Sequence, residues 1–339
     1  MKWTWFIIPA VVFLVLSSDN NADRPAAASG NNSDAASAAT GRNNRAAAAT
    51  EVDSASRYNY ASRRPSCSEY SNYTDRLKNE LLGLDRYLRT HTAISLREEQ
   101  DVGTQALRDL PEAAGGGRLV SSGTMVDYLT AVAAPMLAQV KRKDIRFRFH
   151  VLQGSAPANA FALPGGDIVF TQAILDEWVN NEAQLATILA HEIAHVDERH
   201  PVALIQYIKA LGGDSSSLGH QMAMFIAKLP YSSALEGEAD ALGVRFLHAA
   251  GYSPFQSVRM WEERAGPTKK KAEATGWEGI LDEVLKEAEN LISTHPNDAK
   301  RACALKQEVY DLIREDGAGQ SYVGTTNWRE KVPKGRRVY

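Results

Sequence analysis

Residues 181–200, NEAQLATILAHEIAHVDERH, constrain the fold of this chain more than any other segment. Their apolar side chains recur at helical spacing and form one stripe: Leu185, Ile188, Leu189, Ile193 and Val196. Asn181, with Gln184 three residues later, is typical of a helix start, and Pro201 favours a helix end at His200. The segment therefore predicts a helix that buries this stripe against the rest of a folded domain.

The same helix places two imidazoles one above the other. His191 and His195 are four residues apart, so they lie one turn apart on the same side and can both reach one metal ion. Glu192, next to the first histidine, is placed to touch a metal-bound water without being a ligand itself. Such a pattern arises by chance in about one chain in a hundred of this size. Two unrelated histidines on a helix therefore remain the alternative until a third ligand is found.

Composition restricts which side chains could supply that third ligand. The chain of 339 residues has only two cysteines, Cys67 and Cys303. Two cysteines exclude a framework of disulfides and any cysteine-based zinc finger or iron–sulfur site, so a metal would need histidine and carboxylate ligands. The formal net charge of -3 gives no basic footprint for nucleic acid, and we expect no nucleic-acid partner.

His200 is the nearest further histidine, but its spacing argues against a role as the third ligand. It follows His195 by five residues, and along a helix that step points away from the metal. A histidine near a helix C-terminus and before a proline is more simply interpreted as a cap that suits the helix dipole.

The segment SSALEGEADALG supplies a better candidate. Glu236 and Asp240 are four residues apart on a predicted helix, and Gly243 lies one turn further along the same face. Glu236 would complete a His2Glu ligand set with one open position, and Asp240 could fix the tautomer of a ligating imidazole. Gly243 would let the two helices approach closely. Two alternatives stay open, namely that Glu236 only caps its helix together with Ser233, and that Glu238 is the ligand instead.

Strand patterns are confined to one short part of the chain. Residues 145–151 alternate between apolar and basic side chains, His150 among the latter, which indicates a strand with one buried and one wet face. Two further short strands, NAFAL at 159–163 and DIVFT at 167–171, flank the tight-turn signal PGG. We expect these strands to form a small antiparallel sheet.

Helical patterns account for most of the remaining folded part. Ser95 and Glu98 form a capping box that opens a helix ending before Pro111, and PEAAGGGR is typical of a loop. Almost all of residues 172–314 is predicted to be helical. The expected fold class is therefore α+β, a mainly helical domain over residues 67–325 with a small antiparallel sheet.

The N-terminal residues differ in composition from this domain. Residues 1–18 contain an apolar run too short for an ordinary spanning helix, and we interpret them as a signal peptide or signal anchor. Residues 19–66 are rich in small and polar side chains and predict a disordered linker, and residues 326–339 are assigned to a C-terminal tail. We expect a membrane-associated or exported protein, with the mitochondrial inner membrane, on its intermembrane-space side, as the alternative location.

Several segments carry a more specific resemblance. HEIAHVDERH, LPYSSALEGEADALG and STHPNDAKR resemble the signature segments of metallopeptidase family 48, the HtpX/Oma-like HExxH zinc gluzincins, and AAGYSPFQSVRMWEE resembles the Oma-like branch. The resemblance covers about residues 95–314 and implies a zincin-like metalloprotease domain. It also implies one Zn2+ ion per chain, held by His191, His195 and Glu236, with Glu192 as the catalytic acid–base residue.

The family pattern implies roles for further residues. Asn159, Ala160 and Phe161 fall in a segment similar to the N-A-F-x-x-P-G-G pattern of the family. They would lie on an edge strand whose backbone groups pair with an extended substrate. His295 would face the zinc site and either stabilise the oxyanion or occupy the open coordination position, and Arg301 would be a structural ion-pair partner near it.

The resemblance thus implies a zinc-dependent metalloendopeptidase that cleaves misfolded or membrane-protein substrates in membrane-associated quality control. The alternative from another class is a zinc-bound pseudoprotease or holdase, which would bind unfolded clients on the edge strand without cutting them. Glu192 favours the protease, because a non-catalytic zinc site has no need of that residue. A purely structural zinc site is disfavoured, since such sites are usually rich in cysteine and filled by four protein ligands.

Overall fold

The computed structural model describes residues 64, 65, 67, 93–210, 212, 213, 216–228, 231, 233–265, 299–317 and 321–336. The predicted signal or anchor segment at 1–18 lies outside the described residues, as do most of the predicted linker and His295. Within the described residues, no helix combines the length and the apolar character needed to cross a membrane.

Helices dominate the described residues, with four short strands in the first half of the folded part. The elements in chain order are α3 (Leu96–Ala113), β1 (Arg118–Val120), α4 (Thr124–Leu137), β2 (Arg148–Gln153), β3 (Ala160–Ala162), η4 (Pro164–Gly166), β4 (Asp167–Thr171), α5 (Gln172–Glu177), α6 (Glu182–Asp197), α7 (His200–Ala210), α8 (Leu218–Lys228), α9 (Ser233–Ala249), α10 (Phe255–Ala265), α12 (Ala299–Asp316), α13 (Thr325–Glu330) and η5 (Lys334–Arg336). The predicted mainly helical α+β class is confirmed.

The sheet is mixed, which corrects the expectation of an antiparallel sheet. Its strand order is β1-β2-β4-β3, with β2 and β4 parallel and the two outer pairs antiparallel. The chain leaves β2, turns back through β3 at the far edge and returns as β4 between them, so β4 must run in the direction of β2. The predicted edge strand is confirmed: within the described sheet, β3 pairs only with β4.

The predicted wet face of the strand at 145–151 is confirmed for Arg146 and Arg148, which are exposed, and is wrong for His150, which is buried. The strand begins at Arg148, and its residues from Phe149 to Leu152 are all buried. His150 is buried, and both of its ring nitrogens have a hydrogen-bond partner there, Ser121 Oγ at 2.8 Å and Asp167 Oδ1 at 2.7 Å. These partners offset the cost of removing the imidazole from water. An alternating pattern predicts which side chains share a face, but it cannot show that a polar face is covered by partners.

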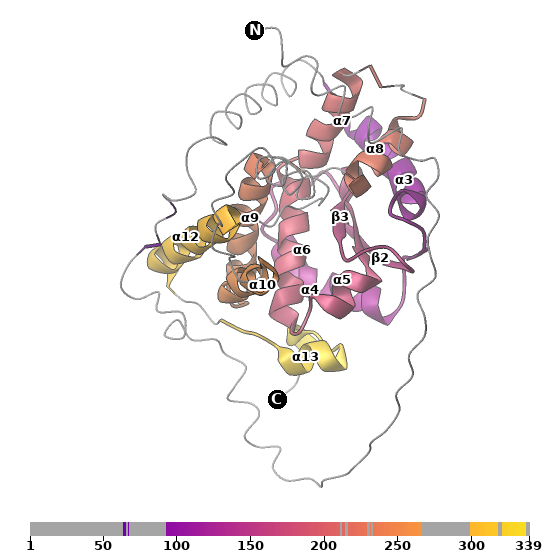
Figure 1. The fold of residues 1–339 in the computed structure, drawn as a ribbon. Helices are drawn as coiled ribbons and strands as arrows, with labels where there is room; N and C mark the ends of the chain where they lie inside the picture. Colours follow the sequence, from indigo (N-terminus) through magenta and orange to yellow (C-terminus); the bar gives the residue numbers. More distant parts are fainter. Residues whose placement is uncertain are drawn as a thin grey trace, which may run out of the picture. The chain divides into compact units, whose positions relative to one another are not determined.

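α6 is the central element of the fold. All sixteen of its residues are buried, and Figure 1 shows it between the sheet on one side and α9 and α10 on the other. The predicted start is confirmed, since Asn181 accepts a hydrogen bond from the backbone N–H of Gln184 at 2.9 Å. The fully buried helix explains how two histidines on it can be held away from solvent.

The end of α6 differs from the prediction. α6 stops at Asp197, Arg199 adopts a left-handed φ of 63°, and His200 begins α7. Pro201 therefore occupies the first turn of a new helix, where its missing N–H costs nothing, rather than ending the previous one. The interpretation of His200 as a C-terminal cap of the helix that carries His191 and His195 is wrong for this reason.

α3 shows a second, similar difference at a proline. Its predicted cap is confirmed, because Ser95 Oγ accepts from the backbone N–H of Glu98 at 3.1 Å. The helix then continues through Pro111 to Ala113, whereas we expected it to end before Pro111. A proline this close to a helix end removes a single backbone donor, and the chain leaves the helix only before Gly115, whose φ is 97°.

The C-terminal residues pack against the start of α6. Glu182 accepts hydrogen bonds from the hydroxyls of Tyr128 and Tyr252 at 2.6 and 2.8 Å, and from the backbone N–H of Lys334 at 3.1 Å. The backbone N–H of Glu182 donates to Gly324 at 3.1 Å. One buried carboxylate therefore joins three separate parts of the chain.

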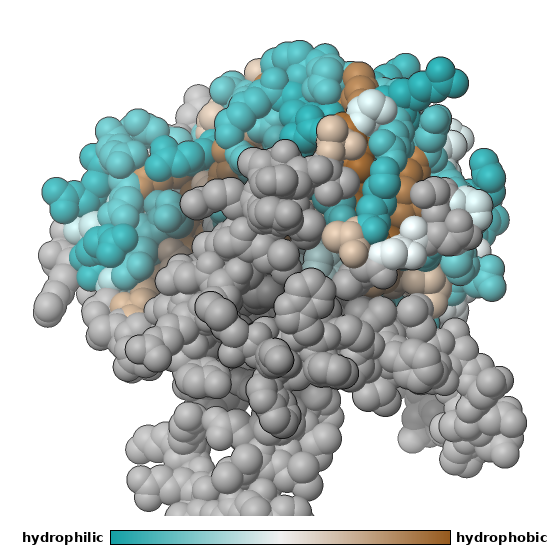
Figure 2. Space-filling view, turned by 90° about the horizontal axis from the view of Figure 1, so that it is seen from above, coloured by the Kyte–Doolittle hydropathy of each residue, from teal (hydrophilic) through white to brown (hydrophobic). Residues whose placement is uncertain are grey.

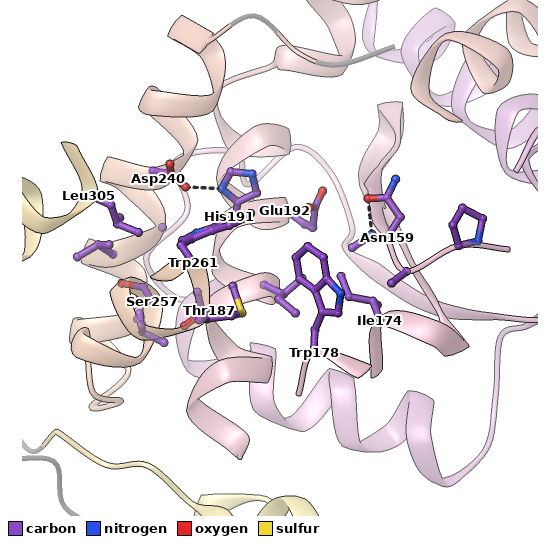
Figure 3. A pocket seen from close by; sticks show the side chains of 18 of the residues that line it. Asn159, Ile174, Trp178, Thr187, His191, Glu192, Asp240, Ser257, Trp261 and Leu305 are labelled. Atoms are coloured by element: carbon purple, nitrogen blue, oxygen red, sulfur yellow. Dashed lines mark hydrogen bonds and ion pairs between the residues drawn. The ribbon is translucent and has the colours of Figure 1, made fainter. Parts of the chain in front are cut away.

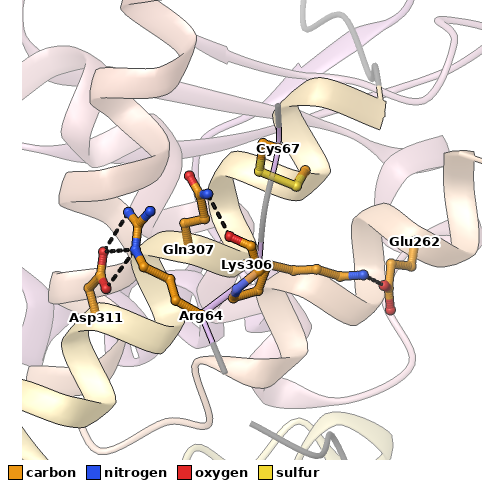
Figure 4. The surroundings of a disulfide bond; sticks show 8 residues. Arg64, Cys67, Glu262, Lys306, Gln307 and Asp311 are labelled. Atoms are coloured by element: carbon orange, nitrogen blue, oxygen red, sulfur yellow. Dashed lines mark hydrogen bonds and ion pairs between the residues drawn. A yellow bond between two sulfur atoms is a disulfide. The ribbon is translucent and has the colours of Figure 1, made fainter. Parts of the chain in front are cut away.

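A disulfide joins Cys67 to Cys303 of α12, across 236 residues of sequence. Figure 4 shows it beside two other contacts of the same segment, in which Arg64 pairs with Asp311 and Gln307 donates to the carbonyl of Pro65 at 2.7 Å. Two cysteines cannot build a framework of several bridges, but they do form this single one. The distance between them in the sequence gave no indication of it.

The described surface is largely polar. Figure 2 shows hydrophilic residues over most of the coloured face, with hydrophobic ones in narrow strips between them. Among the described residues, Leu96 is the one large hydrophobic side chain that is well exposed, at 37%. Apolar side chains are thus concentrated in the core and around one internal cavity.

Candidate metal centre and active site

Three potential metal ligands from two helices meet at one point. His191 Nε2 lies 3.0 Å from His195 Nε2 and 3.3 Å from Glu236 Oε2, and His195 Nε2 lies 3.4 Å from Glu236 Oε1. Ligand atoms about 2.0–2.1 Å from one tetrahedral zinc ion would lie roughly 3.3 Å apart. The three side chains are buried, and their spacing and chemistry fit a zinc ion.

Close contact between α6 and α9 brings Glu236 to the two histidines. A Cβ atom added at Gly243 would lie 3.2 Å from the backbone nitrogen of His191 and 3.3 Å from its Cα. A larger residue at this position would push the helices apart. The structure agrees with the expectation that Gly243 permits the close approach of the two helices.

Asp240 contacts the ring nitrogen of His191 that does not face the other candidate ligands. Its Oδ1 lies 3.0 Å from Nδ1 of His191, as the sequence predicted (Figure 3). Arg301 binds both carboxylate oxygens of Asp240, with contacts of 2.6 and 2.9 Å. Burial alone would raise the pKa of Asp240, but the charge and hydrogen bonds of Arg301 lower it to about 2. With Asp240 ionised, its Oδ1 is placed to accept the Nδ1 proton of His191, which would leave the lone pair of Nε2 to bind a metal.

Arg301 makes a further contact that the sequence did not predict. Its Nη1 lies 2.6 Å from Glu236 Oε2, and its Cζ lies 4.4 Å from the centre of the Trp261 ring. The guanidinium therefore touches both carboxylates beside the candidate metal centre. No sequence pattern links Arg301 to Glu236, which lies 65 positions earlier in the chain.

The field at His191 favours a cation. Burial alone would lower the pKa of His191, but Asp240 and Glu236 raise it to about 9. The same two carboxylates that favour a proton on His191 favour a divalent cation at the same place. In contrast, burial holds the pKa of His195 well below its usual value.

Glu192 faces a cavity beside the candidate ligands. It is buried and lines a cavity of about 380 Å³ together with His191, Asn159 and Ala160 (Figure 3). Phe161 also lies in β3, but it is buried and does not line the cavity. Two of the three residues expected on the substrate edge thus border the same space as Glu192.

His200 and Glu238 extend a series of polar contacts from Nδ1 of His195, the ring nitrogen that does not face the other candidate ligands. His200 Nδ1 lies 2.8 Å from His195 Nδ1, and His200 Nε2 lies 3.2 Å from Glu238 Oε2. The ring of Tyr231 stacks on His195 with a centroid distance of 4.4 Å. A proline in the first turn of a new helix is the one sequence signal for this placement of His200, although Pro201 is equally compatible with the end of the preceding helix. Glu238, the alternative ligand, faces His200 in the structure.

Comparison with known proteins agrees with this geometry. The family model of Peptidase family M48 matches residues 126–309, which is more than half of the chain, and the chain belongs to this family. The predicted family and its Oma-like relationship are confirmed. The matched range begins in α4 and includes the sheet strands β2 to β4 and both helices that carry the candidate ligands.

Two kinds of relatives match part of this chain. The mitochondrial metalloendopeptidase OMA1 of Schizosaccharomyces pombe is 29% identical over 61% of this chain and 60% of its own length. OMA1 of Arabidopsis thaliana is 30% identical over 49% of this chain and 33% of its own length. The beta-barrel assembly-enhancing protease of Escherichia coli is 25% identical over 48% of this chain and 37% of its own length. The chain therefore spans less than two thirds of these relatives.

Proposed function

We propose that this chain is a zinc-dependent metalloendopeptidase that hydrolyses peptide bonds of protein substrates. The observation that carries this proposal is the meeting of His191, His195 and Glu236 at one buried point beside Glu192. The three donors match the His2Glu set of catalytic zinc, which leaves one coordination position open. Membership of Peptidase family M48 supports the same conclusion.

Glu192, Asp240 and Arg301 would have separate roles in peptide hydrolysis. Zinc, when bound, would act as a Lewis acid and lower the pKa of a water molecule. Glu192 accepts a proton from the attacking water and returns it to the leaving amine, a step that contributes about 10²–10⁴-fold. Asp240, itself held by Arg301, keeps His191 in the tautomer that can bind metal.

The edge strand would bind the substrate backbone. Asn159 and Ala160 border the cavity beside Glu192, and β3 pairs with β4 through one of its edges. An extended peptide would add along β3 by main-chain hydrogen bonds that replace existing ones, such as the bond from the backbone N–H of Ala160 to Asn159 Oδ1 at 3.0 Å, with Phe161 contributing backbone groups to the same strand. The oxyanion role of His295 rests on the family resemblance alone.

The named relatives are the basis for proposing substrates and a location for this chain. Named relatives are mitochondrial metalloendopeptidases and a protease that enhances beta-barrel assembly. We therefore propose misfolded or membrane proteins as substrates and a membrane-associated or exported location, with residues 1–18 as the attachment or export signal. The mitochondrial inner membrane is the alternative location.

Substitution of Glu192 tests the proposed activity. The full chain with Glu192→Gln should retain zinc, measured by elemental analysis, and lose casein cleavage, whereas His191→Ala should lose both. Glu112→Gln, the same chemical change at an exposed residue, should keep both. Unchanged casein cleavage by Glu192→Gln would remove Glu192 from the mechanism. A wild-type chain that binds zinc and unfolded casein without cutting it would instead favour the pseudoprotease or holdase.

A further inference from the structure

Three polar side chains meet on neighbouring strands of the sheet, in the spatial order β1-β2-β4. Ser121 directly follows β1, His150 lies in β2, and Asp167 begins β4. His150 Nδ1 lies 2.8 Å from Ser121 Oγ, and His150 Nε2 lies 2.7 Å from Asp167 Oδ1. One imidazole therefore connects a hydroxyl to a carboxylate, with hydrogen-bonding distances on both sides.

The register of the strands explains why these side chains meet. Val120 of β1 is paired with Val151 of β2 in an antiparallel ladder, so Ser121, the next residue, comes opposite His150. Asp167 is paired with the residue two positions before His150. Residues two apart in a strand share a face of the sheet. All three side chains therefore lie on one face, close enough to contact each other.

The same alternation separates this group from the candidate metal centre. Phe149 and Val151, the neighbours of His150 in β2, point to the other face of the sheet. Both belong to the core cluster that includes Ile193 and Ala194 of α6, the helix that carries two of the candidate metal ligands. His150 therefore faces away from the core that surrounds these ligands.

Asp167 determines which nitrogen of His150 carries a proton. Burial alone would raise the pKa of Asp167, but hydrogen bonds from His150 and Arg148 hold it below the ordinary value of 3.8. An ionised carboxylate can only accept, so Nε2 of His150 carries a proton and donates it to Oδ1. In the neutral imidazole, Nδ1 then has a lone pair that accepts the hydroxyl proton of Ser121.

Arg148 fixes the position of this carboxylate. Its Nε lies 2.7 Å from Asp167 Oδ1, and its Nη2 lies 2.5 Å from Oδ2. The Arg148 side chain is 44% exposed, so water screens much of its repulsion of a protonated His150. Asp167 contacts the imidazole directly and without intervening water, so it can stabilise the imidazolium that forms when His150 takes up a proton.

Ser121 is accessible, unlike its two partners. It is exposed, whereas His150 and Asp167 are buried. Helix α4 begins at Thr124, three residues further along the chain, and Gly123 before it makes no side-chain cap to the first backbone N–H groups. Such N–H groups favour negative charge on an oxygen atom. An exposed hydroxyl, a base held by a third group and N–H donors a few residues away are the components of an activated nucleophile.

We propose that Ser121 is an activated nucleophile that accepts an acyl group from small activated esters, with His150 as its general base and Asp167 as the group that orients the base. The bond between Ser121 Oγ and the carbonyl carbon forms, and the bond between that carbon and the leaving oxygen breaks. The hydroxyl proton passes to His150 Nδ1 and from there to the leaving oxygen or to water. This inference is independent of the proposed endopeptidase function.

Acetylation by p-nitrophenyl acetate tests the proposal. The full chain should release about one equivalent of p-nitrophenolate in an initial burst, and mass spectrometry of its peptides should locate the acetyl group on Ser121. Ser121→Ala should remove the burst, and His150→Gln should slow it at least about 100-fold. Ser122→Ala is the matched control and should keep the burst, because Ser122 is equally exposed but it is Ser121 that contacts His150.

Two further measurements make the outcome decisive. Wild-type chain treated with a zinc chelator should show the same burst as zinc-loaded chain, and loss of the burst would assign the reaction to the metal centre and overturn the proposal. Circular dichroism checks the folding of His150→Gln, and Ser121→Ala decides alone if that variant is unfolded, because Ser121 is exposed. Equal bursts of Ser121→Ala and wild type, or acetyl groups on lysines in place of Ser121, would also overturn it.

Discussion

His200 Nδ1 lies 2.8 Å from His195 Nδ1, on the side of the imidazole away from the candidate metal centre. If His195 binds a metal through Nε2, its proton must sit on Nδ1, and His200 Nδ1 must accept it. His200 then carries its own proton on Nε2, which lies 3.2 Å from Glu238 Oε2. The contacts of His200 and Glu238 thus fix the tautomer and the ring orientation of His195, as Asp240 does for His191.

His200→Leu should therefore weaken zinc binding by about 10–100-fold. His200→Gln should recover part of this loss, because its side-chain oxygen can accept the proton of His195. Zinc affinity is measured by competition with a chelator of known affinity. His220→Leu serves as the control, since His220 is half exposed on α8 and pairs with Asp109 rather than with a candidate ligand. Equal zinc affinity of His200→Leu and wild type would contradict the assigned role.

Gly243→Val should separate α6 from α9. A Cβ at position 243 would lie 3.2 Å from the backbone of His191, so we expect the unfolding free energy to fall by about 1–3 kcal/mol and zinc affinity to fall as well. Urea unfolding and chelator competition measure the two effects. Gly237→Ala on the same helix is the control, because a Cβ there meets no atom within 4 Å. That variant should be up to about 1 kcal/mol more stable than wild type.

Asp167→Asn should change how stability depends on pH. Burial alone would raise the pKa of Asp167, but hydrogen bonds from His150 and Arg148 lower it below the ordinary value of 3.8. A lowered carboxyl pKa contributes stability that is fully present above pH 3.8 and is lost as the pH falls through the folded-state value. The variant should be about 1–3 kcal/mol less stable than wild type at pH 7.

Urea unfolding at several pH values checks this expectation. The difference between Asp167→Asn and wild type should narrow below about pH 4, because wild type then loses the same contribution. Asp101→Asn is a suitable control, since Asp101 is well exposed. A difference that widens as the pH falls would show that the ionised form of Asp167 is not the stabilising one.

Sequence spacing alone located much of the candidate site. His191 and His195, and likewise Glu236 and Asp240, are pairs four residues apart on helices, and helical geometry fixes their relative positions without knowledge of the rest of the fold. The capping signal at Asn181 is equally local. These features could be predicted because each depends on neighbours within about one helical turn.

Features that depend on distant parts of the chain could not be predicted in this way. Arg301 reaches Glu236 only because α12 packs on α9, and the direction of β4 depends on where the chain turns back through β3. His200 was misplaced because a proline after a histidine suits both the end of one helix and the start of the next. The left-handed φ of 63° at Arg199 decides between them, and arginine gives no sequence signal for it.

Reduction of the disulfide should loosen α12, the helix that supplies Arg301 and Leu305 to the site. Cys67→Ser removes a crosslink that closes a loop of 236 residues, so the unfolded chain gains conformational freedom and the unfolding free energy should fall by about 2–4 kcal/mol. Thermal unfolding with and without dithiothreitol measures this. Wild type should lose stability in the reductant and approach Cys67→Ser, whereas the variant should not respond. Arg64→Ala is the matched control, because it removes the exposed ion pair with Asp311 and leaves the crosslink intact, and it should lower stability far less than Cys67→Ser does. If Arg64→Ala destabilised the protein as much as Cys67→Ser, docking of the segment rather than the covalent bond would hold α12 in place.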